Sequence, residues 1–228
     1  MKPLAILMLA GLMLASSPSS AYSNDPNGDM FISRSSFDFS NCGPITALML
    51  SKLVKPETTI DSMSDSIDSA RRVVQTNDGE SINYRWWRNG DIKNYLKREK
   101  IGHNAIDTKG LTNTKRQERI INAINKGETV VINVNMNHLP LSLGSGVGKP
   151  YFTVPFITWG HFLVIVGYEE VNGKMAYEVH DSYTKKGKNR LYYVDNINKA
   201  ISRYNNELIV VAKTETPTLK NSVKLTSN

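Results

Sequence analysis

Cysteine is almost absent from this chain, because Cys42 is the only one among 228 residues. A single cysteine cannot form an intramolecular disulfide, so the fold must depend on its apolar core and its hydrogen bonds. An unpaired thiol in an oxidising compartment is a liability unless it reacts, pairs between chains or is deeply buried. This scarcity makes Cys42 a candidate for chemistry, with a small buried apolar residue as the alternative.

Other missing patterns argue against whole classes of function. The four histidines show no His-x-x-x-His spacing, so a zinc enzyme is not predicted and we expect no metal or other cofactor. The formal net charge is +7, but the basic residues are scattered and not interleaved with aromatic residues, which argues against nucleic-acid binding. Nothing in the sequence indicates an oligomeric state.

The first 23 residues have the layout of a secretory signal peptide. Lys2 precedes an apolar run, residues 4–15, which is too short to span a membrane and is followed by small residues up to Ser23. Cleavage after Ala21 and cleavage after Ser23 both fit this pattern. We expect a secreted or periplasmic protein without stable membrane insertion after signal removal, one domain over residues 24–213 and a polar tail over residues 214–228.

Apolar periodicity divides the domain into a helical half and a strand-rich half. Helices are predicted over residues 44–54, 57–75, 91–100 and 113–126, and strands over residues 129–134, 161–168, 175–181, 190–194 and 207–213. A short helix is expected after Val194, and Asn172 with Gly173 is a hairpin signal between two of the strands. Helices followed by an antiparallel sheet indicate the α+β class.

Cys42 lies where the chain enters the first predicted helix. Pro44 suits the first helical turn, where its missing N–H loses no hydrogen bond. The unpaired N–H groups and the positive dipole end at this place favour an anion, so the thiol should ionise more easily than a free cysteine. Gly43 adds no side chain beside the sulfur, which we interpret as room for a substrate.

His161 and Asp181 are the predicted partners of Cys42. They lie on the two strands joined by the hairpin turn and at similar distances from it, so antiparallel pairing should bring them close together. A thiol, an imidazole and a carboxylate in this chain order supply a nucleophile, its base and a group that orients the base.

The remaining histidines are interpreted as structural. His180 directly precedes Asp181, and strand alternation points it to the opposite face of the sheet. The other two, His103 and His138, lie in a loop between helices and just before a glycine-rich stretch.

Three motifs follow one another along the chain: Asn-Cys-Gly-Pro at 41–44, Gly-His-Phe at 160–162 with a Val/Ile run ending in Gly-Tyr, and His-Asp-Ser at 180–182. Over about residues 35–213 they resemble the bacteriocin-processing (double-glycine leader) peptidase-like family, a bacterial group of papain-like cysteine peptidases. The resemblance implies a papain-like fold, in which an N-terminal helical half carries the nucleophile helix and packs on a C-terminal antiparallel β-sheet. It also implies a protein or peptide substrate and a thioester on Cys42, with His161 as base and Asp181 as orienting residue.

The sequence departs from the family at the oxyanion donor. The family usually has a Gln a few residues before the cysteine, and residues 33–41 contain none. The backbone N–H of Cys42 remains a donor, and Asn41, Ser36 or Arg34 are candidates for the second one. We also expect a substrate cleft lined by the aromatic side chains of Trp86, Trp87 and Trp159. The alternative for each of them is a position in the hydrophobic core.

Several functions therefore stay open beside an exported cysteine peptidase. One is a peptidoglycan amide hydrolase with related Cys–His chemistry, and another is a deamidase- or transpeptidase-type toxin that uses the same thioester. A third is a catalytically inactive papain-like binding module. The missing Gln favours the last, whereas the presence of all three triad residues argues against it.

Overall fold

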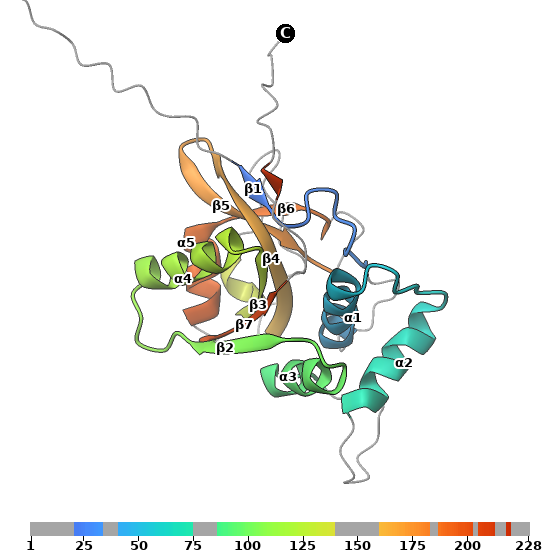
Figure 1. Ribbon diagram of the computed structural model, residues 1–228. Helices are drawn as coiled ribbons and strands as arrows, with labels where there is room; N and C mark the ends of the chain where they lie inside the picture. Colours follow the sequence, from blue (N-terminus) through green and yellow to red (C-terminus); the bar gives the residue numbers. More distant parts are fainter. Residues whose placement is uncertain are drawn as a thin grey trace, which may run out of the picture.

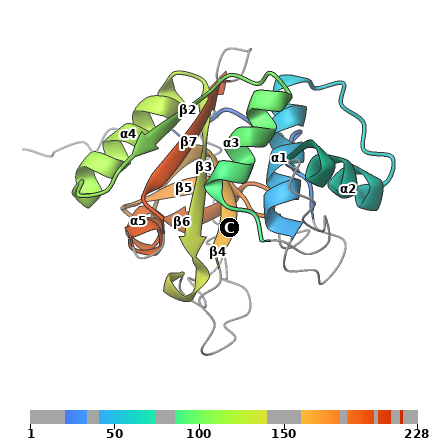
Figure 2. The same ribbon diagram turned by 90° about the horizontal axis from the view of Figure 1, so that it is seen from below.

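The computed structural model describes residues 21–33, 41–74, 86–139, 160–182, 187–202, 205–212 and 218–219. These residues form three layers, with an antiparallel sheet between two groups of helices (Figures 1 and 2). One face of the sheet is covered by α1 (Cys42–Val54), α2 (Met63–Val74) and α3 (Asn89–Arg98). The other face is covered by α4 (Asn113–Asn125) and α5 (Val194–Ser202). The predicted α+β class is confirmed.

β4 (Gly160–Val171) lies at the centre of the sheet. On one side it pairs with β3 (Glu128–Asn135) and, further along, with β1 (Tyr22–Ser23). On its other side it pairs with β5 (Lys174–His180) across the predicted turn, where Asn172 and Gly173 have positive φ angles of 52° and 74°. The remaining strands extend the sheet: β7 (Glu207–Ala212) and β2 (His103–Asp107) beyond β3, β6 (Arg190–Tyr193) beyond β5, and β8 (Thr218–Leu219) beyond β1.

Side chains of β4 alternate between two hydrophobic cores. Phe162, Val164 and Val166 pack on the side of α1, α2 and α3. Leu163 and Ile165 pack on the side of α4 and α5. All five are at most 1 % exposed. A strand covered on both faces is apolar on both faces, which explains the continuous apolar run in the sequence.

The helix α1 is buried almost all round. Ile45, Ala47, Met49 and Leu50 have no exposed surface, because α2, α3 and β4 enclose the helix. A helix that is apolar on every side belongs in a core rather than at a surface. The first residue of α1 is thereby held against the middle of the sheet.

Two sequence predictions about elements were wrong. The second helix begins at Met63 rather than at residue 57, because the Ser62 hydroxyl accepts a hydrogen bond from the Asp65 N–H (3.3 Å) and so starts the helix there. His103 lies in the edge strand β2 rather than in a loop. The side chains of β2 are mostly exposed and show no alternation, so the strand arises from backbone pairing with β7.

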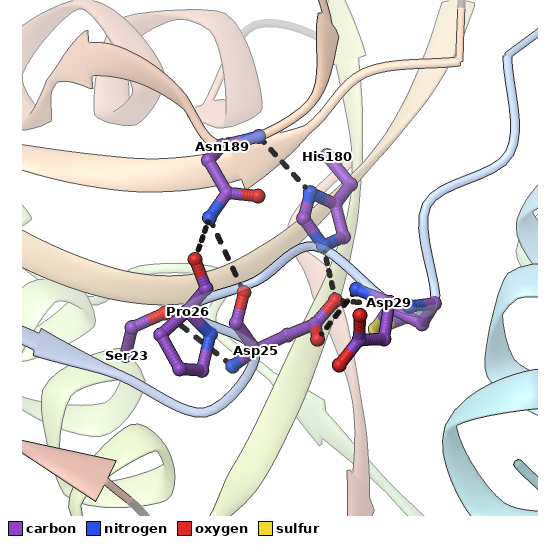
Figure 3. A network of polar contacts seen from close by, with 7 residues as sticks. Ser23, Asp25, Pro26, Asp29, His180 and Asn189 are labelled. Carbon is purple, nitrogen blue, oxygen red and sulfur yellow. Dashed lines mark hydrogen bonds and ion pairs between the residues drawn. The ribbon is translucent and has the colours of Figure 1, made fainter.

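The turn after β1 is fastened to the end of β5 by a buried network around Asp25 (Figure 3). Asp25 Oδ2 lies 2.7 Å from His180 Nε2, and the carboxylate accepts backbone N–H groups of Asp29 (2.9 Å) and Met30 (3.1 Å). The Asn189 N–H donates to His180 Nδ1 (3.3 Å), so the proton on His180 is assigned to Nε2, facing Asp25. Burial alone would raise the pKa of Asp25, but the hydrogen bonds from His180 and the two backbone N–H groups lower it.

We predict that Asp25→Asn lowers the free energy of unfolding by about 3 kcal/mol at pH 7, because it disrupts a network of hydrogen bonds to a buried carboxylate. Asp29→Asn removes an exposed carboxylate from the same turn, and its effect should stay within about 0.5 kcal/mol. Urea denaturation measures both, and equal midpoints for the two variants would contradict the prediction.

The same experiment has an expected pH dependence. A carboxyl group whose folded-state pKa is lowered contributes stability above its unfolded pKa of about 3.9, and this contribution is lost as the pH falls through the folded value. The difference between wild type and Asp25→Asn should therefore shrink as the pH is taken below about 4.

Candidate active site

Cys42 is the first residue of α1, and it is only 5 % exposed. Its sulfur is hydrogen-bonded by two backbone N–H groups, those of Gly43 in the same helix and of Phe162 in β4. Asn41, which precedes the helix, makes no side-chain cap to the first turn. The N–H groups and the dipole of the helix start are thus available to stabilise a thiolate.

The space beside Gly43 is filled by Trp87. A Cβ atom added to Gly43 would lie 2.4 Å from the Cβ of Trp87, so the absence of a side chain permits this close packing. The interpretation of Gly43 as room for a substrate was wrong. Trp87 is buried against Tyr95 (ring centroids 6.2 Å apart), whereas Trp86 is 46 % exposed. Trp159 lies outside the described residues, and an aromatic cleft stays a prediction.

β4 and β5 bring His161 and Asp181 together. His161 Nε2 lies 2.8 Å from Asp181 Oδ1, and both side chains are at most 2 % exposed. His161 is also hydrogen-bonded to the Cys42 side chain. Because Nε2 faces the carboxylate, Nδ1 is the ring nitrogen left for the thiol. Cys42, His161 and Asp181 therefore form one continuous buried chain of polar contacts.

The charges within this chain support one another. Burial opposes a charge on His161, but the Asp181 carboxylate and the contact with Cys42 outweigh it and raise the pKa of His161 to about 9. Burial also opposes a charge on Cys42, but the hydrogen bond and charge of His161, together with the backbone N–H groups of Phe162 and Gly43, lower the pKa of the thiol. Both shifts favour the charged form of the pair, a thiolate beside an imidazolium, over the neutral form.

Asp181 is held by groups that the sequence analysis missed. The Tyr192 hydroxyl on β6 donates to Asp181 Oδ2 (3.1 Å), and the Asp181 N–H donates to the Gly187 carbonyl (3.0 Å). No sequence signal separates Tyr192 from its neighbour Tyr193, because both lie in a short strand that contains no polar–apolar alternation. The pairing of β6 with β5 decides which of the two rings enters the core.

Asn41, a predicted oxyanion donor, is fixed by Arg71 of α2. Arg71 Nη2 donates to Asn41 Oδ1 at 2.7 Å, and both residues are buried. With the oxygen engaged in this way, the amide NH₂ is the part of Asn41 oriented away from Arg71. An arginine on the apolar face of a helix, beside Ile67, Ala70 and Val74, was the available sequence signal for such a contact. Ser36 and Arg34 lie outside the described residues.

The other histidines do not join Cys42. His180 contacts Asp25 and packs edge-on against Phe31, His103 Nδ1 lies 3.0 Å from the Ile101 carbonyl, and His138 ends the 3₁₀ helix Met136–His138. Within the described ranges, no cluster of three or more His, Cys, Asp or Glu residues is suited to a metal ion. No helix in that part of the chain is long and apolar enough to cross a bilayer.

Comparisons with known proteins place the chain in a family. Residues 23–207 match the model of the peptidase C39-like family, which is more than half of the sequence. No curated protein matches the chain significantly. Among solved structures, a protein from Bacillus anthracis that is provisionally named as a C39-like peptidase is similar, with 16 % identity and a TM-score of 0.54 over 86 % of this chain and 98 % of that one. At this identity the likeness concerns the fold. The match to the family model shows that the chain belongs to the peptidase C39-like family of papain-like cysteine peptidases.

Proposed function

We propose that this protein is a cysteine peptidase that hydrolyses a peptide or related amide bond through a thioester on Cys42, with His161 as its base and acid and Asp181 as the residue that orients His161. The observation that carries the proposal is the buried chain of contacts from Cys42 through His161 to Asp181. Membership of a peptidase family supports a reaction of this class and a protein or peptide substrate.

The geometry supports a two-step reaction. The Cys42 thiolate attacks the carbonyl carbon, and the imidazolium of His161 gives its proton to the leaving amine as the C–N bond breaks. Water then attacks the thioester, His161 takes a proton from the water, and the acid product leaves as the thiolate re-forms. Asp181 keeps the imidazole in the required tautomer and stabilises the imidazolium in both steps.

We further propose that the oxyanion is stabilised by the backbone N–H of Cys42 and by the side-chain NH₂ of Asn41. The first group lies at the open start of α1, and the second is oriented by Arg71. The Asn41 amide would take the place of the Gln that the family usually carries. Each such donor contributes on the order of a hundredfold or more to the rate.

Export to the periplasm or beyond also belongs to this proposal, and the fold favours one of the two cleavage positions. Tyr22 stacks on Tyr168 (ring centroids 5.9 Å apart), and the fully buried Ser23 pairs with Gly167 of β4. The Asn24 N–H donates to the Val166 carbonyl (2.7 Å). Cleavage after Ser23 would remove β1, so we infer that the signal peptide ends at Ala21.

We predict that Cys42 in the native protein reacts with iodoacetamide at pH 6, because its partner His161 stabilises the thiolate. In His161→Ala the titration midpoint should move up toward the unperturbed value of about 8.5. Mass spectrometry of alkylation rates between pH 4 and pH 10 measures this. His103→Ala, which changes a histidine at the sheet edge, should behave like wild type. If the thiol of the native protein titrates like the thiol of the urea-unfolded protein, the peptidase proposal is wrong.

We predict that kcat/KM for peptide cleavage rises as Cys42 ionises and falls near pH 9, because above its raised pKa His161 cannot protonate the leaving amine. Asp181→Asn should lower kcat/KM by about 10²- to 10⁴-fold and move the alkaline limb down toward about pH 6.5, since the carboxylate raises the pKa of His161.

The substrate for these profiles would be chosen from a mixed-sequence library of fluorescence-quenched peptides, as one cleaved by wild type and not by Cys42→Ala. Clearing of a peptidoglycan suspension by the wild type alone, without peptide cleavage, would favour the cell-wall alternative. An alkaline limb that stays near pH 9 in Asp181→Asn would contradict the role given to Asp181.

We predict that the exported protein begins at Tyr22, as read by intact-mass and N-terminal peptide analysis of the extracytoplasmic fraction. A chain that starts at Tyr22 should melt at a higher temperature than one that starts at Asn24, because only the first retains β1. Ala21→Leu should slow processing, since small residues are needed before the cleaved bond. An N-terminus at Asn24 would show that the inferred position is wrong.

A further inference from the structure

We propose that Tyr192 is a positioning residue of this active site: its phenol fixes the Asp181 carboxylate in the orientation in which Asp181 holds His161. The inference rests on the proposed function, because it takes Cys42, His161 and Asp181 as the reacting triad. It adds a fourth member to that chain of contacts, supplied by the strand β6.

The two oxygens of Asp181 receive donors from two different strands. Oδ1 faces His161 Nε2 of β4 at 2.8 Å, and Oδ2 accepts the Tyr192 hydroxyl of β6 at 3.1 Å. Rotation about the last torsion of an aspartate side chain is soft, so a single donor leaves the carboxylate plane poorly defined. Donors on both oxygens fix that plane, and with it the direction in which Oδ1 meets the imidazole.

The Tyr192 side chain is held in a fixed position by its surroundings. Its ring has no exposed surface, and it lies on a strand whose backbone pairs with β5, the strand that leads into Asp181. The guanidinium carbon of Arg190 lies 5.3 Å from the ring centroid. A cation over the face of a phenol withdraws electron density from it, which makes the hydroxyl a better donor.

The charged and titratable groups around Asp181 are supplied by the strands β4 and β6 and by the helix α1. β4 contributes His161, with Cys42 of α1 behind it, and β6 contributes Tyr192 with Arg190. The adjacent residue on β5, His180, lies on the opposite face and contacts Asp25 (Figure 3). Since Asp181 is fully buried, hydrogen bonds from protein groups must stabilise its charge.

The structure offers a matched control in Tyr177. Tyr177 of β5 is the direct cross-strand partner of Tyr192, and both side chains are fully buried. Within the described part of the chain, the Tyr177 hydroxyl has no hydrogen-bond partner. Tyr177→Phe and Tyr192→Phe therefore each remove one oxygen atom from neighbouring buried rings, and only Tyr192→Phe removes a bond to Asp181.

The test compares the pH dependence of Cys42 alkylation by iodoacetamide in wild type, Tyr192→Phe and Tyr177→Phe, each first shown by urea denaturation to be folded. In Tyr192→Phe the rate at pH 6 should fall about three- to tenfold, the range that the loss of one buried hydrogen bond allows. The limiting rate at high pH should stay unchanged, because the thiolate itself is intact. Tyr177→Phe should match wild type at every pH.

A double-variant comparison separates positioning from a general weakening of the fold. If Tyr192 acts through Asp181, adding Tyr192→Phe to Asp181→Ala should leave the alkylation profile of Asp181→Ala unchanged. A further loss of reactivity in the double variant would overturn the inference. This comparison can also be made if Tyr192→Phe alone does not fold. In the double variant the Asp181 carboxylate is absent, so no buried charge is left without the hydrogen bond from Tyr192.

The two proposals fail in different ways. A wild-type thiol that titrates like a free cysteine overturns the peptidase function and this inference together. A reactive wild-type thiol with identical profiles for Tyr192→Phe and Tyr177→Phe overturns the role of Tyr192 and leaves the peptidase function standing.

Discussion

The hydrogen bond between His161 and Asp181 is the contact on which the rest of the site depends. It joins two side chains that water hardly reaches, and a buried imidazole beside a carboxylate holds its proton more firmly than one in solution. That retained positive charge is in turn what lowers the pKa of Cys42. Without the carboxylate, burial would lower the pKa of His161 and raise that of Cys42, which disfavours the charged form of both.

The architecture can be understood as the means of bringing two distant parts of the chain together at this contact. The hairpin of β4 and β5 carries His161 and Asp181, and the buried helix α1 presents its first residue to the same strand (Figure 1). Because α1 is enclosed on all sides, its start has little freedom to move away from β4. The packing of Trp87 against Gly43 adds to this restraint.

The segment from Tyr22 to Met30 is also part of the fold. β1 pairs with β4, and Asp25 ties the following turn to His180, the residue before Asp181. Asn189, which belongs to the same network, lies on the loop that leads from Asp181 into β6 and Tyr192 (Figure 3). The backbone of Asp181 is therefore restrained from the N-terminal side, while Tyr192 restrains its carboxylate.

Much of this organisation could be predicted from local patterns. The continuous apolar run of β4, the Asn172 and Gly173 turn, the Cys42 helix start and the place of His161 and Asp181 near one another all follow from periodicity and turn chemistry, which act over short stretches of chain. The start of α2 and the strand β2 were predicted wrongly, because a single cap and the backbone of a distant strand outweighed the local pattern.

Only the tertiary structure decided which side chains support the proposed triad. Tyr192 reaches Asp181 and Arg71 reaches Asn41 across 11 and 30 residues of sequence, and Asp25 reaches His180 across 155. Such contacts depend on strand register and on which face a residue presents after packing, and a shift of one residue in register would turn Tyr192 away from the core. The sequence by itself determined which residues are candidates for the reaction and which elements carry them, whereas long-range packing determined how each one is held.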